Sequence, residues 1–301
     1  MGRLDGAVAR RRRAQGGLSG WPALARASAH DAAARLPFVL DGRPIGSVAR
    51  AHLPALQTLG LQVDAAQVAL HCAPDEVDAT LARLNAVLRA QGLILAWRDE
   101  PFPILDPADG ARLGAMERAA ARFWGTLTRG AHANGWVGDA AGRPTHLWIA
   151  QRSLTKATDP GRHDNLIGGG VADGQTPRQA LVREGWEEAG LSPAQVQGAA
   201  CGSVLRLQRD IPEGLQHEWL YAFDLQLPAG LQPRNQDGEV AAFACLPLAE
   251  ALHLAAGDTM TVDAALVTLD FALRRTLLEA PLRQWVEAHW QACRVAAVQH
   301  F

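Results

Sequence analysis

The stretch GGGVADGQTPRQALVREGWEEAGL, residues 168–191, decides the fold of this chain. It predicts a glycine turn followed by a helix with a signal at each end. Thr176 and Gln179 have the spacing of a capping box, and Pro177 stands where proline is favoured as the first helical residue. Gly190 occupies the place where a left-handed residue commonly ends a helix. The helix therefore has a fixed start and a fixed end.

Three glutamates share one face of this helix. At about 100° per residue, Glu184, Glu187 and Glu188 fall within roughly a third of the circumference. Like charges at these spacings weaken an isolated helix, and a divalent cation such as Mg²⁺, which binds carboxylate oxygens, offsets that repulsion. Arg183 lies on the flank of the arc, where it can brace the loop or a carboxylate. The opposite side is expected to bury against a sheet through Val182, Trp186 and Ala189.

A glutamate-rich helix face is by itself more often a solvated surface than a site. A solvated face, however, does not require a glycine turn, a capped start and a glycine stop at fixed offsets around the carboxylates. We therefore interpret Glu184, Glu187 and Glu188 as catalytic, metal-binding residues, with Arg183 supporting them.

The segment resembles the Nudix box, G-x5-E-x7-R-E-U-x-E-E-x-G-U, in which U is an aliphatic residue. The positions that match at the right spacings are Gly169, Arg183, Glu184, Glu187, Glu188, Gly190 and Leu191. Gln175 replaces the first glutamate of the box, which in the family usually supports the metal ligands from outside. Gly185 replaces the first aliphatic residue, at a cost of about 1 kcal/mol of helix stability.

The resemblance extends over residues 30–260, which are similar to bacterial and fungal Nudix proteins related to thiamin pyrophosphokinase. The supporting segments are AHANGW (131–136), HLWIAQRS (146–153), PGRHDNLIGGG (160–170) and DGEVAAF (237–243). These relatives carry a dedicated domain before the Nudix unit. The resemblance implies an α+β protein: a Nudix α/β/α sandwich with a mixed sheet, preceded by a small α+β domain.

The resemblance also implies a reaction, the hydrolysis of a pyrophosphate bond by water with Mg²⁺ as cofactor and Mn²⁺ as its alternative. A further metal ligand often comes from outside the box. Glu239 is the first candidate for it, and Glu218 is the second. The general base varies within the family, and the sequence does not identify it.

Substrate-binding candidates flank the box. Arg152 and Lys156 follow a predicted strand and can bind the pyrophosphate, although a surface role is equally compatible with their positions. Gly168, Gly169 and Gly170 allow the backbone to approach phosphates or to turn into the helix. The scattered histidines and tryptophans are interpreted as structural, among them His132, His146, His163, His217, Trp136, Trp148 and Trp219.

The expected substrate is a small organic pyrophosphate, and the resemblance implies thiamin diphosphate or a damaged form of it. ADP-ribose, nucleoside diphosphate sugars and dinucleotides are alternatives. A second hypothesis is a Nudix-like module that binds a nucleotide without cleaving it, with Gln175 as a sign of lost activity. An isomerase of the isopentenyl type needs a catalytic cysteine, and the sequence places none near the box.

Bulk composition limits the partners. The chain has 301 residues, which favours two domains, and a net charge of −2 excludes a general nucleic-acid binder. Four cysteines far apart and without a CxxC pair predict reduced thiols in a cytoplasmic protein. The apolar stretches are too short to cross a membrane. The expected partners are the substrate and, at most, a second copy of the chain in a homodimer.

Residues 1–29 are predicted to be a disordered leader. The run Arg10–Arg13 is followed by AQGGLSG rather than by an apolar segment, so a secretory signal is not expected. Residues 131–301 are assigned to the Nudix domain with C-terminal helices. Its expected strands cover 131–138, 146–152, 200–206, 218–225 and 240–246, and its expected helices cover 177–189, 262–275 and 282–292.

Residues 30–130 are predicted to form the small α+β domain, the candidate to cover the site and contact the organic part of the substrate. The turn dipeptide Asp41-Gly42 separates two expected strands. Apolar residues at helical spacing predict a helix over 75–91. The elements expected after it are a strand over 93–97 and a helix through Met116, Phe123, Trp124 and Leu127.

Overall fold

A seven-stranded mixed sheet carries the C-terminal part of the chain in the computed structural model, which describes residues 20–295. Its strands are β7 (Leu127–Gly138), β8 (Pro144–Arg152), β9 (His163–Asp164), β10 (Ile167–Gly170), β11 (Ala200–Ile211), β12 (Gly214–Gln226) and β13 (Val240–Pro247). The order is β11-β12-β7-β8-β13, with β10 paired to β7 and β9 to β8. Only the β12–β7 pair of this described sheet is parallel.

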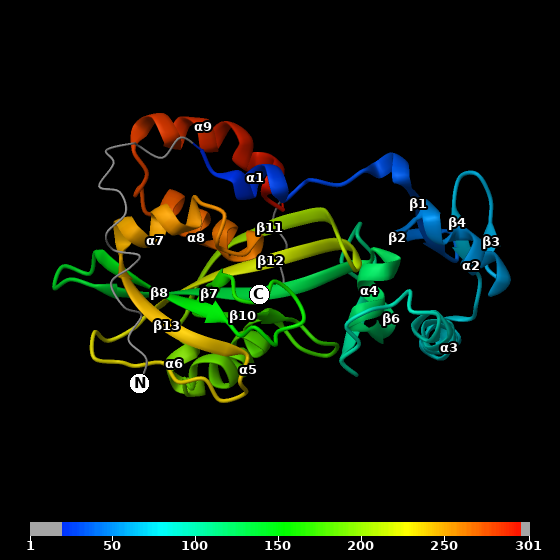
Figure 1. Cartoon of the computed structure of the whole chain (residues 1–301), viewed down its shortest axis with the longest axis horizontal. Helices are drawn as coiled ribbons and strands as arrows, with labels where there is room; N and C mark the ends of the chain where they lie inside the picture. The colour runs from blue at the N-terminus through cyan, green and yellow to red at the C-terminus, as the bar shows by residue number, and fades with distance from the viewer. Residues whose placement is uncertain (1–19, 296–301) are drawn as a thin grey trace.

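Helices cover both faces of this sheet, as Figure 1 shows. One face carries α5 (Pro177–Ala189) and α6 (Pro193–Val196), and the other carries α1 (Pro22–Arg26), α7 (Leu248–Ala255), α8 (Val262–Arg274) and α9 (Ala280–Trp290). Each face has its own cluster of buried apolar side chains. The predicted α/β/α sandwich with a mixed sheet is therefore confirmed. Helix α7 is not among the helices that the sequence predicts.

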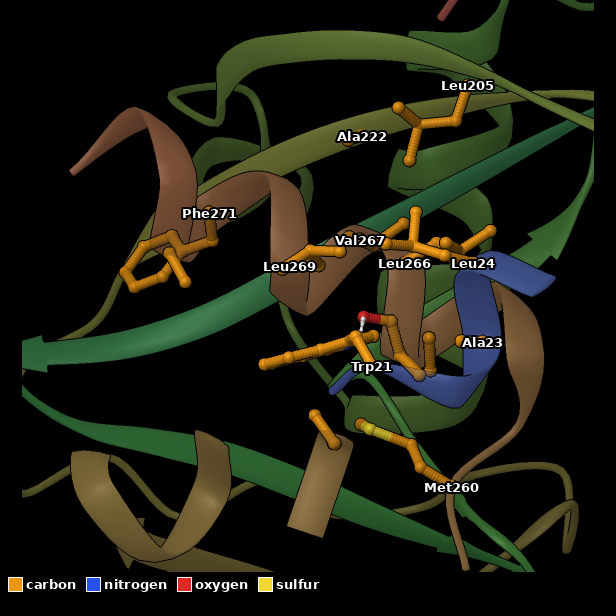
Figure 2. Close-up of a cluster of buried hydrophobic side chains, with 14 of the residues drawn as sticks. Trp21, Ala23, Leu24, Leu205, Ala222, Met260, Leu266, Val267, Leu269 and Phe271 are labelled. Atoms are coloured by element: carbon orange, nitrogen blue, oxygen red, sulfur yellow. Dashed lines mark hydrogen bonds between the residues drawn. The ribbon is translucent and has the colours of Figure 1, made fainter. Parts of the chain in front are cut away.

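The segment 20–29 is ordered, so the prediction of a disordered leader is wrong for these residues. Trp21 is 1% exposed, and its indole N–H donates to the Ala265 carbonyl oxygen of α8 at 3.0 Å; Figure 2 shows the ring among the side chains of that core. Ala27 accepts a backbone hydrogen bond from Gln208 of β11. Burial of its apolar side chains thus holds this segment against the Nudix domain. Residues 1–19, with the run Arg10–Arg13, lie outside the described residues.

The N-terminal unit has a four-stranded sheet with a core of its own. Its elements are β1 (Arg35–Leu40), β2 (Arg43–Ala49), α2 (Leu53–Thr58), β3 (Gln62–Val63), β4 (Val68–Leu70) and α3 (Val77–Ala90), with sheet order β2-β1-β4-β3. Asp41 and Gly42 both have positive φ, at 45° and 81°, as the predicted hairpin turn requires. Four short 3-10 turns occur in the described chain, at Ala32–Ala34, Arg50–His52, Pro74–Glu76 and Gln291–Cys293.

A hairpin and a short helix complete this unit beside the Nudix sheet: β5 (Pro101–Leu105), β6 (Arg112–Glu117) and α4 (Arg118–Trp124). The predicted strand over 93–97 is absent, because Ala96 adopts a left-handed conformation with φ of 57°. The predicted second helix is shorter than expected. Glu117 caps its start, and Gly125, at φ of 59°, ends it, so Met116 belongs to β6 and Leu127 to β7.

The two units contact one another through β5, β6 and α4. Arg112 of β6 forms a two-bonded ion pair with Asp173, at 2.7 and 2.8 Å, in the loop that leads into α5. The Asp173 amide also donates to the Pro101 carbonyl oxygen. The N-terminal unit therefore packs directly on the loop that precedes the glutamate helix. In the described part of the chain, no helix has the length and apolar character to cross a membrane.

Candidate active site

A cavity of about 690 Å³ lies where the two units meet. From the Nudix unit, its lining includes the glycines of β10 and Glu184 and Glu187 on α5. From the N-terminal unit, it includes Arg98, Arg118 and Arg122. The predicted residues Arg152, Lys156, Glu218 and Glu239 line it too, so the structure brings together candidates that are far apart in the sequence.

Helix α5 has the predicted ends, and of the three residues predicted to face the sheet, Ala189 and Val182 pack on its core whereas Trp186 does not. Thr176 and Gln179 form the reciprocal capping box, and Gly190 adopts φ of 65°. Trp186 is 53% exposed, so the prediction that it packs on the sheet is wrong. Glu184 and Glu188 are instead 8% and 4% exposed. The carboxylates point inward because the glycines of β10 leave room for them.

Each glycine of β10 has a steric reason in the structure. A Cβ atom on Gly169 would overlap the Glu184 side chain, and one on Gly170 would overlap the Phe102 ring of the N-terminal unit. Gly168 donates its N–H to Glu188 Oε2 at 2.8 Å. The glycines thus let the strand approach the glutamates closely, while a direct contact with phosphate stays a prediction.

Gly185 also fills a position that has no room for a side chain. A Cβ atom there would lie 2.8 Å from Val196 Cγ2 and 3.1 Å from Ile167 Cδ1. We expect Gly185→Ala to lower the free energy of unfolding by about 1 kcal/mol, because overpacking outweighs the gain in helix propensity. Urea denaturation measures this, with Gly198→Ala as control, since nothing lies within 4 Å of that position. A more stable Gly185→Ala protein would contradict this prediction.

Two basic side chains, Arg183 and Lys156, form ion pairs with the four glutamates proposed as metal ligands. Arg183 contacts Glu184 at 2.9 Å and Glu187 at 2.8 Å, and it also donates to the Gly170 carbonyl oxygen at 3.1 Å. It therefore braces both the carboxylates and the strand, as its position on the helix predicted. Lys156 contacts Glu188 Oε1 at 2.7 Å and Glu239 Oε2 at 2.8 Å.

Burial sets the electrostatics of these glutamates. Burial and the nearby Glu188 raise the pKa of Glu184 to about 8, against the opposing charge of Arg183. Burial likewise raises the pKa of Glu188, although Lys156 opposes it. For Glu239, burial is outweighed by the hydrogen bond and charge of Lys156 and by Arg98, so its pKa is lowered.

This donor set fits a divalent cation. Glu184 and Glu188 are carboxylates whose ionised forms are disfavoured by burial and by their mutual repulsion, and a cation held by them would offset both effects. Residues 20–295 hold no three acidic, histidine or cysteine side chains already arranged around a common point. In the structure, the positive charges of Lys156 and Arg183 neutralise these carboxylates. The assignment of Glu184, Glu187, Glu188 and Glu239 as metal ligands therefore stays a prediction.

Arg152 lines the cavity, but its guanidinium is hydrogen-bonded to other residues of the protein. It donates to Asp164 Oδ2 at 2.7 Å and, through Nε and Nη2, to the Thr158 carbonyl oxygen at 3.1 and 2.7 Å. Asp164 is buried, and its pKa is lowered because the charges of Arg152, His132 and Lys156 outweigh the effect of burial. Arg152 thus fixes the loop before β9. Its predicted contact with phosphate stays untested.

Glu218, the second candidate for an additional ligand, lines a different part of the cavity. Its carboxylate accepts a hydrogen bond from Gln216 Nε2 at 2.8 Å, and the same amide contacts Asp263 at 3.1 and 3.3 Å. Burial and the charge of Asp263 raise the pKa of Glu218. Glu239, by contrast, shares Lys156 with Glu188, so the structure favours Glu239 as the partner of the glutamate helix.

No pattern in the sequence indicates Arg98, Arg118 and Arg122 as cavity residues. They belong to the N-terminal unit, where no motif marked them, and only the fold brings them to the glutamates. The three candidate tryptophans, Trp136, Trp148 and Trp219, are buried, and none of them lines this cavity.

His217 is a partly buried histidine whose pKa is lowered to about 4 from 6.5, mainly by burial. Because the unfolded chain binds this proton first, we expect stability to fall as pH drops from 6.5 to about 4, by roughly 3 kcal/mol. His217→Gln should weaken that dependence, as measured by urea denaturation at several pH values, whereas the exposed His253→Gln should retain it. An unchanged pH dependence in His217→Gln would rule the explanation out.

Comparisons with known proteins agree with this arrangement. Residues 129–265 match the NUDIX domain, and residues 21–128 match a domain of unknown function (DUF4743). The chain is 30% identical over 251 residues to Nudix hydrolase 24, chloroplastic, of Arabidopsis thaliana, which covers 81% of this chain and 68% of that protein. It is 34% identical over 203 residues to Nudix hydrolase 20, chloroplastic, of the same plant, covering 67% of this chain and 54% of the relative.

The chain thus spans about two thirds of the first relative and about half of the second. Among solved structures, DR0079 from Deinococcus radiodurans is 22% identical, and the match covers 57% of this chain and 99% of that one with a TM-score of 0.43. The identity to the first relative, the match to the NUDIX domain and the box on α5 lead to one assignment. The chain belongs to the Nudix hydrolases, a pyrophosphohydrolase family, and carries an additional N-terminal domain before its Nudix domain.

Proposed function

We propose that this protein hydrolyses a pyrophosphate bond in a small organic diphosphate with the help of Mg²⁺, or of Mn²⁺ in its place. The observation that carries the proposal is the buried pair Glu184 and Glu188, held against the glycines of β10. Two ionisable carboxylates at this depth are costly unless a cation accompanies them. Glu184 lines a cavity of about 690 Å³, large enough for a small organic molecule.

The side chains have distinct parts in this reaction. Glu184, Glu187 and Glu188 would hold the metal, with Glu239 as the additional ligand; when bound, the metal neutralises charge on the phosphates and lowers the pKa of a water molecule. Arg183 keeps Glu184 and Glu187 oriented. The Gly168 N–H fixes Glu188 in one position.

Within this class, thiamin diphosphate or a damaged form of it is the substrate that we propose. The support is the resemblance of residues 30–260 to Nudix proteins related to thiamin pyrophosphokinase. The high polarity of the cavity side chains is compatible with that substrate and with ADP-ribose or a dinucleotide. The choice among them therefore rests on direct assay.

The test is hydrolysis by the full chain with Mg²⁺ and a panel of thiamin diphosphate, its oxidised analogues, ADP-ribose, NADH and dinucleoside polyphosphates. Phosphate-containing products are separated by chromatography. We expect turnover of at least one compound, lost in Glu187→Gln and retained in Glu250→Gln, which changes an exposed glutamate of α7. Hydrolysis of the other compounds but not of thiamin diphosphates would reject the narrower proposal. Binding without turnover in Mg²⁺ and Mn²⁺ would favour a sensing module.

A further inference from the structure

Helix α4 of the N-terminal domain presents two arginines to the cavity. Arg118 and Arg122 are one helical turn apart, so their side chains lie on the same face of the helix, and both line the cavity and a small adjoining recess with Gly170 and Glu218. The proximity of Arg118 is one reason why the pKa of Arg122 is lowered, after the larger effect of burial. Two like charges thus face one another in a partly enclosed space.

Arg122 is largely buried, yet its guanidinium forms very few ion pairs or hydrogen bonds. Its side chain is 22% exposed, and its one ion pair within the described chain is to Glu213 Oε2 at a long 3.9 Å. No side-chain hydrogen bond of Arg122 occurs among residues 20–295. A guanidinium carries five N–H donors in a planar fork. Within the described chain no Arg122 nitrogen is both fully buried and unpaired, so its donors are open to an acceptor in the cavity. Glu218 and Asp263 act on it through charge but make no ion pair with it.

Arg118 is also incompletely paired. Its Nη1 donates to Glu100 Oε2 at 2.9 Å, and the guanidinium lies over the Phe102 ring. Arg118 is close enough to Glu184 to lower the pKa of that carboxyl. An anion that accepts from Arg118 and Arg122 would therefore lie beside the metal-binding glutamates.

We propose that Arg118 and Arg122 form a binding site for a phosphate oxyanion, so that the N-terminal domain supplies the phosphate-binding cations of the Nudix cavity. A tetrahedral anion with several acceptor oxygens suits forked guanidinium donors. The inference rests on the proposed function, because it identifies the phosphate group as part of the organic diphosphate. It gives this N-terminal domain a role in substrate binding.

The experiment measures binding of methylenediphosphonate, which has no hydrolysable bridge, and of orthophosphate to the full chain. Titration calorimetry is carried out in metal-free buffer and again with excess Mg²⁺. We expect Arg122→Gln and Arg118→Gln each to weaken binding of the preferred probe about tenfold or more, the usual effect of losing a hydrogen bond to a charged group. The preferred probe distinguishes a diphosphate site from a site for a single phosphate.

The control is Arg112→Gln, which removes an arginine from the same domain boundary but outside the cavity, where it pairs with Asp173. It should bind the probe as the unaltered chain does. Thermal unfolding separates a binding role from a structural one. Since Arg122 lacks close partners, Arg122→Gln should unfold at the same or a higher temperature, whereas a structural arginine would lower it.

The proposal fails if the unaltered chain binds neither probe, or if both cavity variants bind as tightly as Arg112→Gln. It also fails if Arg122→Gln loses binding only together with its folded structure while Arg118→Gln binds normally. Arginine-dependent binding without any hydrolysis would support the site and reject the proposed reaction. Hydrolysis that is indifferent to both arginines would do the reverse.

Discussion

Replacing Glu188 by glutamine should reduce kcat/KM for the best substrate by about 100-fold to 1000-fold, the usual range when one preorganised charged or polar group is lost from an active site. The substitution keeps the shape of the side chain and removes its charge. Glu188 is the glutamate most completely enclosed: it accepts from the Gly168 N–H at 2.8 Å and from Lys156 at 2.7 Å. No solvent molecule can replace a carboxylate at that depth.

The same substitution should leave the fold intact, because an amide oxygen can still accept from Gly168 or Lys156. Circular dichroism checks this, and steady-state kinetics with Mg²⁺ measures the loss. Glu250→Gln is the matched control, since it makes the same chemical change on an exposed helix. Full activity in Glu188→Gln would remove this residue from the catalytic group and weaken the proposed metal site.

Trp21→Ala should lower the free energy of unfolding by about 4 kcal/mol, within the usual range for loss of a buried aromatic side chain. The ring is 1% exposed and packs between α1 and α8 (Figure 2). Its removal leaves a cavity and abolishes the indole hydrogen bond to the Ala265 carbonyl oxygen. Urea denaturation followed by far-UV circular dichroism measures the change.

Trp285→Ala is the control for that substitution, because this tryptophan of α9 is 42% exposed. It should cost much less. Trp21→Phe should fall between the two, since it keeps most of the apolar contact and loses the indole hydrogen bond. Equal stability of Trp21→Ala and Trp285→Ala would show that the segment 20–29 contributes little to the fold.

The sequence predicts correctly those features, such as helix ends and tight turns, that depend on residues close together in the chain. The ends of α5 were predicted because Thr176, Gln179 and Gly190 act on their own helix. The turn at Asp41-Gly42 was predicted for the same reason. The inward direction of Glu184 was not predicted, because burial of charged side chains runs against the general tendency. Trp186 was assigned to the core by that same tendency and is exposed instead.

Contacts between distant residues account for the other differences. Lys156 lies in the loop before β9, and the fold brings it into contact with Glu188 of α5. Arg118 and Arg122 belong to another domain, and no residue pattern links them to the box. The helix at Pro22–Arg26 is short, and it follows an arginine- and glycine-rich stretch. Its order comes from docking on α8, which local propensity cannot show.

The position of α1 has a consequence for how the two domains can be separated. The chain begins its described course on the Nudix sheet, leaves it to build the N-terminal sheet, and returns to it at Leu127 (Figure 1). The first helix of the N-terminal region, α1, thus packs on the Nudix domain rather than on the N-terminal sheet. A fragment that starts at residue 127 would lack Trp21 and expose the apolar surface of α8. A version of the Nudix domain made without the N-terminal sheet therefore has to keep α1, and truncation at residue 127 does not.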